Sequence, residues 1–329
     1  MSAPMSRRRL GGLEVSAVGL GCMSMTPVYA APDADGAIAT IHRAPDLGID
    51  FLDTSDAYAQ GRNEDMVGRA IAGRRNRYVI ATKFGNLRRP DGTAAVDGRP
   101  EYAREACEAS LKRLGIDTID LYFVHRIDPT VPIEDTMGAL ADLVRQGKVR
   151  HVGLSEAGPA TIRRAHAAHP LAALQTEYSL WSRDVEAGTL DLCRELGIGF
   201  VAYSPLGRGF LTGAIDATTA FGDKDVRSHM PRFLGEQLAR NLALVAPLRK
   251  LAAVERCSPA QLALAWVLSR GDTIVPIAGT SHVRWLEDNA AAVSLAPSPA
   301  TLAALDETFR PGVAAGTRYP EAMMPRLGL

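Results

Sequence analysis

Short apolar segments rich in β-branched residues alternate along this chain with amphipathic stretches of roughly ten to sixteen residues. Such alternation is typical of βαβ units, in which helices connect the strands of a parallel sheet. Eight strand–helix pairs in about 280 residues favour a closed α/β fold, the (β/α)8 TIM barrel, over an open doubly wound sheet. We interpret the following segments as its strands: Ala17–Gly21, Phe51–Asp53, Val79–Lys83, Ile119–His125, His151–Ser155, Ala173–Glu177, Gly199–Tyr203 and Thr273–Pro276.

Two further segments depart from the repeat. Arg8–Glu14 contains Gly11-Gly12 and predicts an N-terminal β-hairpin before the first barrel strand. A long loop follows the seventh strand, around Asp216–Phe233, and loops of this length usually act as lids or binding loops. Because barrels of this kind run to about 250 residues or more as one unit, we expect residues 1–329 to form a single domain.

Composition excludes several classes of function. The chain has 37 basic and 37 acidic residues, so its net charge of zero gives no reason to expect nucleic acid or an acidic membrane surface as a partner. The four cysteines are far apart and form no CxxC pair, which suits a reducing compartment and predicts no metal site. No apolar run approaches the ~20 residues needed to cross a bilayer. We therefore expect a cytoplasmic protein, and the sequence carries no signal for an oligomeric state.

Ionisable and polar residues lie at the predicted strand ends. The second strand ends in Asp53, with Tyr58 following five residues later, and the third and fourth strands end in Lys83 and His125. Because the carboxyl ends of the strands form the active site in this fold, these side chains are expected to meet at one mouth of the barrel. Ser155, Gln175, Tyr203 and Ser204 lie at or near the ends of later strands.

The chemistry of this group follows from its members. A buried lysine needs a counter-charge, which Asp53 on the neighbouring strand can supply. The ammonium of Lys83 would then favour the ionised form of Tyr58 and lower the pKa of its phenol. A phenol placed in this way can donate a proton to a carbonyl oxygen, while His125 hydrogen-bonds the same oxygen. Taken singly, each residue is more often structural, so the prediction depends on their joint occurrence on consecutive strand ends.

Several motifs, in order along essentially the whole chain, resemble the aldo-keto reductase superfamily, in particular bacterial members with a Gly-Leu-Ser-Glu sequence. They are Asp53-Thr54 with Tyr58, Ala81-Thr82-Lys83, Asp120–His125, Gly153-Leu154-Ser155, Tyr203–Gly209, Pro276–Thr280 and Leu286–Asn289. The resemblance implies an NADP-dependent reductase of the alcohol dehydrogenase class, which reduces small aldehydes or ketones with hydride from NADPH. It also implies a catalytic tetrad of Asp53, Tyr58, Lys83 and His125, with Tyr58 as general acid/base.

The same resemblance implies where NADP(H) binds. Ser155 and Gln175 would hold the carboxamide, Tyr203 would stack on the nicotinamide, and the loop around Asp216–Phe233 would close over the dinucleotide. Ser204, Leu206, Arg208 and Gly209 would line the pyrophosphate, as expected for the usual phosphate site of this fold. The remaining cofactor-binding residues would be Met23, Asp53, Gly279, Thr280, Ser281, Glu287 and Asn289.

The chain departs from the pattern of the superfamily at two positions that bear on the cofactor. Glu156 stands where Asn is frequent, and it can accept from the carboxamide but cannot donate to it. Trp285 stands where many members have the arginine that binds the 2′-phosphate, so a preference for NADPH would depend on Thr280, Ser281, His282 and Arg284. Specificity for the carbonyl substrate should come from Thr26–Ala31, the region around Arg88–Arg99, Trp181 and the tail after Pro311.

Two other functions stay open at this point. The chain could be an NADP(H)-binding regulatory subunit of a partner protein, similar to the barrel β-subunits of potassium channels, which keep the tetrad as well. It could also be an unrelated barrel lyase or isomerase, which the cofactor motifs disfavour. Turnover of a generic aldehyde would distinguish a reductase from a regulatory subunit. Binding of NADP(H) or NAD(H) would distinguish a reductase from a lyase or isomerase.

Overall fold

The computed structural model describes residues 5–29, 33–89 and 93–329, and within them eight parallel strands close into a barrel. Around the barrel the strands follow the order β10-β11-β12-β3-β4-β5-β8-β9. Their bounds are β3 Gly19–Gly21, β4 Phe51–Asp53, β5 Val79–Phe84, β8 Ile119–Val124, β9 Val149–Ser155, β10 Ala173–Glu177, β11 Gly199–Tyr203 and β12 Ile274–Gly279. The predicted fold is confirmed.

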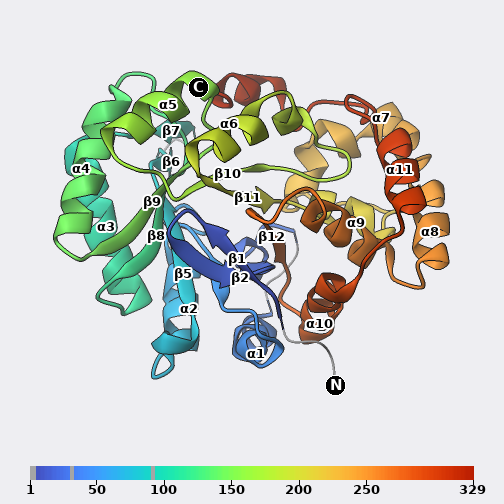
Figure 1. Ribbon diagram of the computed structural model, residues 1–329, viewed down its shortest axis with the longest axis horizontal. Helices are drawn as coiled ribbons and strands as arrows, with labels where there is room; N and C mark the ends of the chain where they lie inside the picture. Colours follow the sequence, from blue (N-terminus) through green and yellow to red (C-terminus); the bar gives the residue numbers. More distant parts are fainter. Residues whose placement is uncertain (1–4, 30–32, 90–92) are drawn as a thin grey trace.

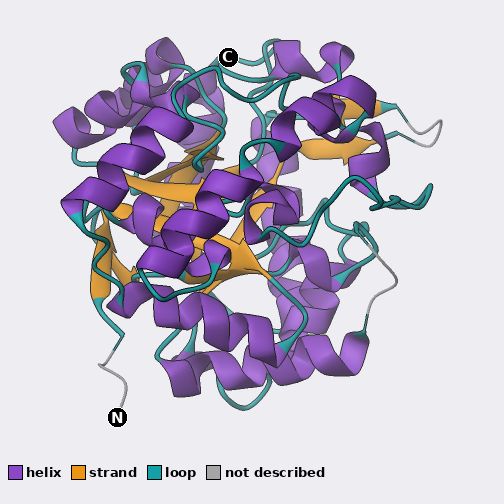
Figure 2. Ribbon diagram, turned by 90° about the vertical axis from the view of Figure 1, so that its right-hand side faces the viewer, coloured by secondary structure: helices purple, strands orange, loops and turns teal. Residues whose placement is uncertain are grey.

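Helices surround the barrel on its outer side (Figures 1 and 2). Their bounds are α1 Ala34–Arg43, α2 Arg62–Ile71, α3 Pro100–Leu114, α4 Ile133–Arg145, α5 Pro159–Ala168, α6 Thr189–Leu196, α7 Gly235–Leu242, α8 Val245–Val254, α9 Pro259–Leu268, α10 Val283–Ala291 and α11 Pro299–Thr308. Local signals set their ends: α3 begins at Pro100, whose fixed φ suits a first helical position, and ends before Gly115 with its left-handed φ of 64°. Apolar helix faces and outward strand residues form the main core between the two layers.

An N-terminal hairpin closes one end of the barrel. Its strands, β1 (Arg7–Leu10) and β2 (Leu13–Ser16), pair antiparallel, as the sequence predicts, and lie across the barrel in Figure 1. Leu10 and Val15 are fully buried and belong to the same apolar cluster as inward residues of the barrel strands, including Phe51 and Phe123. At Gly199 a Cβ would lie 2.4 Å from the Cα of Leu10, so the hairpin packs directly on the barrel backbone.

The structure differs from the predicted elements in detail. A second hairpin, β6 (Asn86–Arg88) and β7 (Ala94–Val96), follows β5 and was not predicted. The predicted first barrel strand is too long, because residues 17 and 18 connect it to the N-terminal hairpin, and the last strand runs on to Gly279. The loop after β11 contains short 3-10 helices at Gly207–Thr212, Val226–His229 and Pro231–Phe233.

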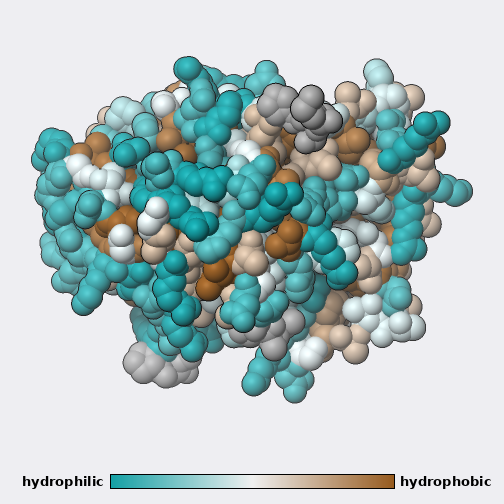
Figure 3. Space-filling model, turned by 90° about the horizontal axis from the view of Figure 1, so that it is seen from below, coloured by the Kyte–Doolittle hydropathy of each residue, from teal (hydrophilic) through white to brown (hydrophobic). Residues whose placement is uncertain are grey.

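The surface is mixed in character. Seen from below, it is largely hydrophilic, with hydrophobic patches scattered among polar side chains (Figure 3). Among the residues that the structure describes, none of the helices has the length and apolar character needed to span a membrane.

Candidate active site

A cavity of about 1010 Å³ lies at the carboxyl ends of the barrel strands. Most of the residues that the sequence predicts for the site line it: Met23, Asp53, Tyr58, His125, Ser155, Gln175, Tyr203, Ser204, Leu206, Arg208, Gly209, Gly279, Thr280, Ser281 and Asn289. Residues from strands far apart in the sequence meet here because all eight strands point their carboxyl ends to one side.

Lys83 and Asp53 form a buried ion pair under the cavity. The ammonium of Lys83 lies 2.5 Å from Oδ1 of Asp53 and donates a second hydrogen bond, of 2.7 Å, to the carbonyl of Thr54. The adjacent strands β4 and β5 present the two side chains side by side, and Lys83 is fully buried. Although burial opposes the charged form, Asp53 and Tyr58 outweigh it and raise the pKa of Lys83, so the lysine is cationic at neutral pH.

Tyr58 lies above this pair. Its hydroxyl accepts a hydrogen bond of 3.2 Å from Nζ of Lys83, and the ammonium is 4.9 Å from the centre of its ring. Burial raises the pKa of the Tyr58 phenol, and the opposing effect of Lys83 is smaller. The expected lowering of this pKa is therefore wrong, because desolvation of the phenolate outweighs the attraction of the ammonium. The phenol stays protonated at neutral pH, which is the form that an acid requires.

His125 lies beside Tyr58, with ring centroids 5.9 Å apart and planes at 87°. Nδ1 of His125 is 3.0 Å from the hydroxyl of Ser55. Burial, followed by the charges of Arg126, Lys83 and Arg326, holds the pKa of His125 well below its usual value. The imidazole is consequently neutral and has one N–H to donate.

Ser155 and Gln175 are register partners on strands β9 and β10, and Gln175 contacts the Lys83–Asp53 pair. The amide nitrogen of Gln175 donates to Oδ2 of Asp53 at 2.8 Å, which leaves its carbonyl oxygen as an acceptor. Nη1 of Arg126, a residue that the sequence analysis did not single out, donates to the hydroxyl of Ser155 at 3.2 Å. The two side chains thus offer a donor and an acceptor at one wall of the cavity.

The loop after β11 supplies a turn with unusual backbone angles. Ser204 and Arg208 have φ values of 50° and 56°, and Gly207 and Gly209 also have positive φ. Gly207 is required here, because a Cβ would lie 2.6 Å from the indole nitrogen of Trp181. Strained turns of this kind concentrate at ligand sites, and backbone N–H groups in them can face an anion.

The last barrel strand leads into the far end of the cavity. Gly279, Thr280 and Ser281 line it there, together with Asp288 and Asn289 of α10. Glu287 does not line the cavity, because its carboxylate is paired with Arg43 at the surface, 3.0 Å away. The ring of Trp285 is 48% exposed and stacks on the guanidinium of Arg284. Only one face of α10 points toward the cavity, and the sequence motif alone does not show that Glu287 lies on another face.

The loop predicted as a lid lies across the cavity. Val226, Arg227, His229 and Met230 line the cavity from this loop. The backbone N–H of Val226 donates to the carbonyl of Val28 at 2.9 Å, which joins the loop to the segment after β3. The guanidinium of Arg227 lies 5.1 Å from the ring of Tyr29 on the same segment.

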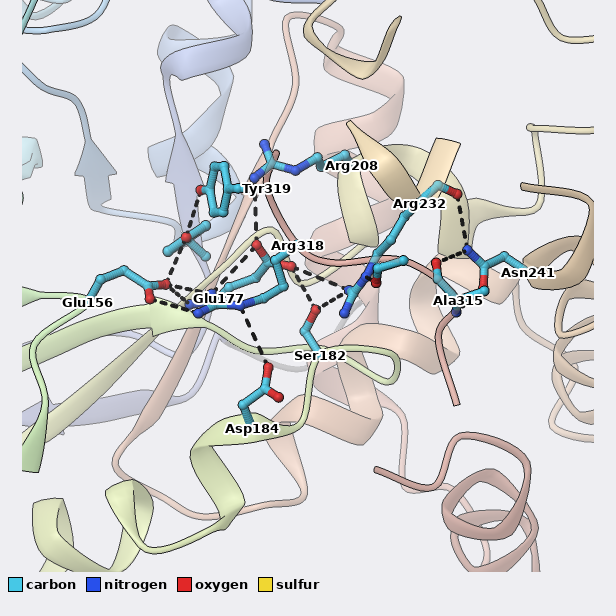
Figure 4. A network of polar contacts seen from close by, with 12 residues as sticks. Glu156, Glu177, Ser182, Asp184, Arg208, Arg232, Asn241, Ala315, Arg318 and Tyr319 are labelled. Carbon is cyan, nitrogen blue, oxygen red and sulfur yellow. Dashed lines mark hydrogen bonds and ion pairs between the residues drawn. The ribbon is translucent and has the colours of Figure 1, made fainter. Parts of the chain in front are cut away.

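Figure 4 shows a second buried ionic group, here called the tail network. It consists of Glu156, Glu177, Arg208, Arg232, Arg318 and Tyr319. Arg318 binds both carboxylate oxygens of Glu156, at 2.8 and 2.9 Å. The hydroxyl of Tyr203 donates to Glu156 at 2.8 Å and lies 2.9 Å from the hydroxyl of Tyr319. Burial would raise the pKa of Glu156, but Arg318 keeps it below its usual value, so Glu156 is ionised. Glu156 does not line the cavity.

The predicted specificity regions have mixed outcomes. The tail after Pro311 lines the cavity with Tyr319, Pro320, Met323, Arg326 and Leu327. Trp181 does not, because its ring is buried and stacks on Phe210 at 4.2 Å. Val28 and Tyr29 line the cavity from Thr26–Ala31, and residues 30–31 of that segment lie outside the described residues, as do 90–92 of the region around Arg88–Arg99.

The chain matches the model of the aldo/keto reductase family over residues 17–309. Among solved structures, the glycerol dehydrogenase AKR11B4 from Gluconobacter oxydans is similar at 30% identity and a TM-score of 0.85, with 95% of this chain and 97% of that chain covered. The holo form of aldo-keto reductase AKR11C1 from Bacillus halodurans is similar at 29% identity and a TM-score of 0.77, with coverages of 96% and 99%. An aldo/keto reductase from Klebsiella pneumoniae in complex with NADP and acetate is similar at 26% identity and a TM-score of 0.74, with coverages of 97% and 99%.

Proposed function

The chain belongs to the aldo/keto reductase family and is an NAD(P)-dependent oxidoreductase, and we propose that it reduces an aldehyde or ketone to the alcohol with Tyr58 as general acid. The observation that carries this proposal is the contact of Tyr58 with the ammonium of Lys83 at the wall of the cavity. NADPH, when bound, supplies the hydride that adds to the carbonyl carbon.

The residues around Tyr58 have distinct roles in this proposal. The phenol donates its proton to the carbonyl oxygen, and Lys83 stabilises the phenolate that forms. Asp53 keeps Lys83 charged and in place. If Ser55 donates to Nδ1 of His125, the Nε2–H of the neutral ring is free to hydrogen-bond the carbonyl oxygen and orient it. The reverse reaction, oxidation of an alcohol, uses the same groups with Tyr58 as base.

The residues present fit a dinucleotide with phosphate groups. Nη2 of Arg208 is buried and has no hydrogen-bond partner among the described residues, although it lies 3.6 Å from Oε2 of Glu177. Such a donor beside the strained turn suits a pyrophosphate. Thr280, Ser281 and His282 line the far end of the cavity, and Arg284 lies beside them over the ring of Trp285. We propose that these residues bind the 2′-phosphate, so that NADPH binds more tightly than NADH.

The proposal is tested with the variant Tyr58→Phe. Removing the hydroxyl should lower kcat for 4-nitrobenzaldehyde by at least about 10²-fold, because proton donation is lost. NADPH binding, followed by protein fluorescence, should stay within about twofold of the wild type, since the phenyl ring keeps its packing. Tyr102→Phe is a matched control, because Tyr102 lies on α3 outside the lining of the cavity.

Two results would count against the proposal. Full activity of Tyr58→Phe would exclude this tyrosine as the acid. NADPH binding by the wild type without turnover of any aldehyde tested would favour the regulatory-subunit alternative. In the same titrations, equal dissociation constants for NADPH and NADH would show that the neighbours of Trp285 do not recognise the 2′-phosphate.

A further inference from the structure

Arg126 is a partly buried cation that lines the cavity directly after His125. Its Nη1 donates to the carbonyl of His125 at 2.6 Å and to the hydroxyl of Ser155 at 3.2 Å, and both acceptors are neutral. Arg126 forms no ion pair with any carboxylate of the described residues. The guanidinium has five N–H donors, so most of its hydrogen-bonding capacity is left over.

A second arginine, Arg326, has the same character. It comes from the tail and lines the cavity with Leu327. Its Nη2 donates to the side-chain oxygen of Asn86 at 3.0 Å and to the carbonyl of Ala95 at 3.1 Å, which are again neutral acceptors. Burial and the charge of Arg126 lower the pKa of Arg326, so the two guanidinium groups are near enough to repel each other.

Two other arginines that line the cavity are paired within the protein, whereas Arg88 lines it and forms no ion pair with a described carboxylate. Arg227 pairs with Asp225, and the guanidinium of Arg208 lies 3.6 Å from the carboxylate of Glu177, which balances its charge without a hydrogen bond. Among the described residues, three carboxylates line the cavity, those of Asp33, Asp53 and Asp288, and Asp53 already binds Lys83. Of these unpaired arginines, Arg126 and Arg326 are the two whose charges act on His125, and neither forms an ion pair with a described carboxylate, although the whole chain has a net charge of zero. Uncompensated, partly buried cations are costly unless an anion joins them.

We propose that the carbonyl substrate carries an anionic group, a carboxylate or a phosphate, which binds Arg126 and Arg326 while its carbonyl oxygen faces Tyr58 and His125. The inference rests on the proposed reductase function. The anionic group is unchanged in the reaction: a hydride adds to the carbonyl carbon, the proton of Tyr58 goes to the oxygen, and NADPH becomes NADP⁺. Arginine suits this role because its planar fork matches carboxylate and phosphate oxygens.

The test compares anionic aldehydes with neutral partners of similar shape. For the carboxylate arm, kcat/KM is measured for 3- and 4-carboxybenzaldehyde and for their methyl esters. For the phosphate arm, glyceraldehyde 3-phosphate is compared with glyceraldehyde. The wild type should prefer the anionic member of at least one pair by about tenfold or more, mainly through a lower KM, because charge-assisted hydrogen bonds to arginine are strong. The substrate pair that shows the preference identifies the anionic group as a carboxylate or a phosphate.

Variants assign the preference to these two residues. Arg126→Met and Arg326→Met should each reduce the ratio of anionic to neutral kcat/KM by about fivefold or more, and Arg326→Lys should restore part of it. Arg310→Met is a matched control, because Arg310 is an exposed tail residue that pairs with Glu307. High salt should reduce the wild-type ratio as well.

The outcomes separate the two proposals. Turnover of the neutral aldehydes without any preference for the anionic partners would overturn the inference and leave the reductase function standing. An anionic preference that survives in both arginine variants would overturn the assignment to Arg126 and Arg326. Absence of turnover with every aldehyde of both arms would overturn the reductase function and, with it, the inference.

Discussion

Two buried ionic groups lie at the mouth of this barrel, and they are built in different ways. The first, Asp53–Lys83 with Tyr58, comes from adjacent parallel strands and the loop after one of them. The second, the tail network around Glu156 and Arg318, joins the end of β9 to a residue 162 positions away. The barrel fixes the first group through strand register, whereas the second depends on where the tail lies. The first would carry the chemistry and the second would hold the ring of Tyr203, so their loss should have different consequences.

The largest effect is expected for Lys83→Met. The loss of the ammonium removes the group that stabilises the phenolate, so kcat should fall by about 10²–10⁴-fold. It also leaves Asp53 buried without its cation, which should lower the free energy of unfolding by about 3–5 kcal/mol. Urea denaturation and steady-state kinetics measure the two quantities.

A second variant separates stability from chemistry in that group. Asp53→Asn combined with Lys83→Met removes both charges, and it should recover much of the stability while kcat stays low. If the double variant were as unstable as Lys83→Met, the Asp53–Lys83 pair would not be the source of the loss.

An intermediate effect is expected for Arg318→Met in the tail network. Arg318 is 11% exposed, and Glu156 keeps its hydrogen bonds from Tyr203 and from the backbone of Glu177. The free energy of unfolding should therefore fall by about 1–3 kcal/mol. Arg318 holds Glu156, which accepts a hydrogen bond from Tyr203, so the ring of Tyr203 should be less well fixed in the variant. The KM for NADPH should therefore rise several-fold while kcat for the aldehyde changes little. A drop in kcat as large as that of Lys83→Met would remove the distinction between the two groups.

The pH dependence of this variant has a defined sign. The pKa of Glu156 is lower in the folded chain than in the unfolded one, chiefly because Arg318 opposes the effect of burial. Its stabilising contribution is thus present above the ordinary glutamate pKa and is lost as the pH falls through the folded value. The difference in unfolding free energy between the wild type and Arg318→Met should therefore stay constant from pH 7 to about pH 5 and shrink as the pH falls further.

An effect of opposite sign is expected for Asp56→Asn, a position between Asp53 and Tyr58 in the sequence. Burial, followed by the nearby carboxylate of Glu64, raises the pKa of Asp56 to about 7. A carboxyl whose folded pKa is raised costs stability as the pH rises from its unfolded pKa through the folded one. Asp56→Asn should therefore stabilise the protein by roughly 1–3 kcal/mol at pH 8 and by much less at pH 4. An equal effect at both pH values, measured by thermal unfolding, would mean that Asp56 is ionised throughout.

The two groups also differ in how far the sequence predicts them. Asp53, Lys83 and His125 follow β-branched or apolar strand segments, so their position at one mouth follows from the fold, and most of the predicted cofactor residues line the cavity for the same reason. In the sequence, Glu156 differs from the Asn frequent in the family, and no pattern of apolar residues around Arg318 indicates that it is buried. The pairing of these two depends on the path of the tail, which contains no strand. The pKa of Tyr58 was mispredicted because the extent of its burial is a property of the assembled cavity.

The N-terminal hairpin has a consequence for the order of events in a catalytic cycle. It closes the barrel end opposite the cavity, so cofactor and substrate share one entrance. If the nicotinamide lies against Gln175 and Ser155 at the bottom of the cavity, a carbonyl compound held by Tyr58 and Arg326 lies between it and solvent. The dinucleotide must then bind first and leave last. Product inhibition by NADP⁺ should therefore be competitive with NADPH, whereas inhibition by the alcohol should not be competitive with NADPH.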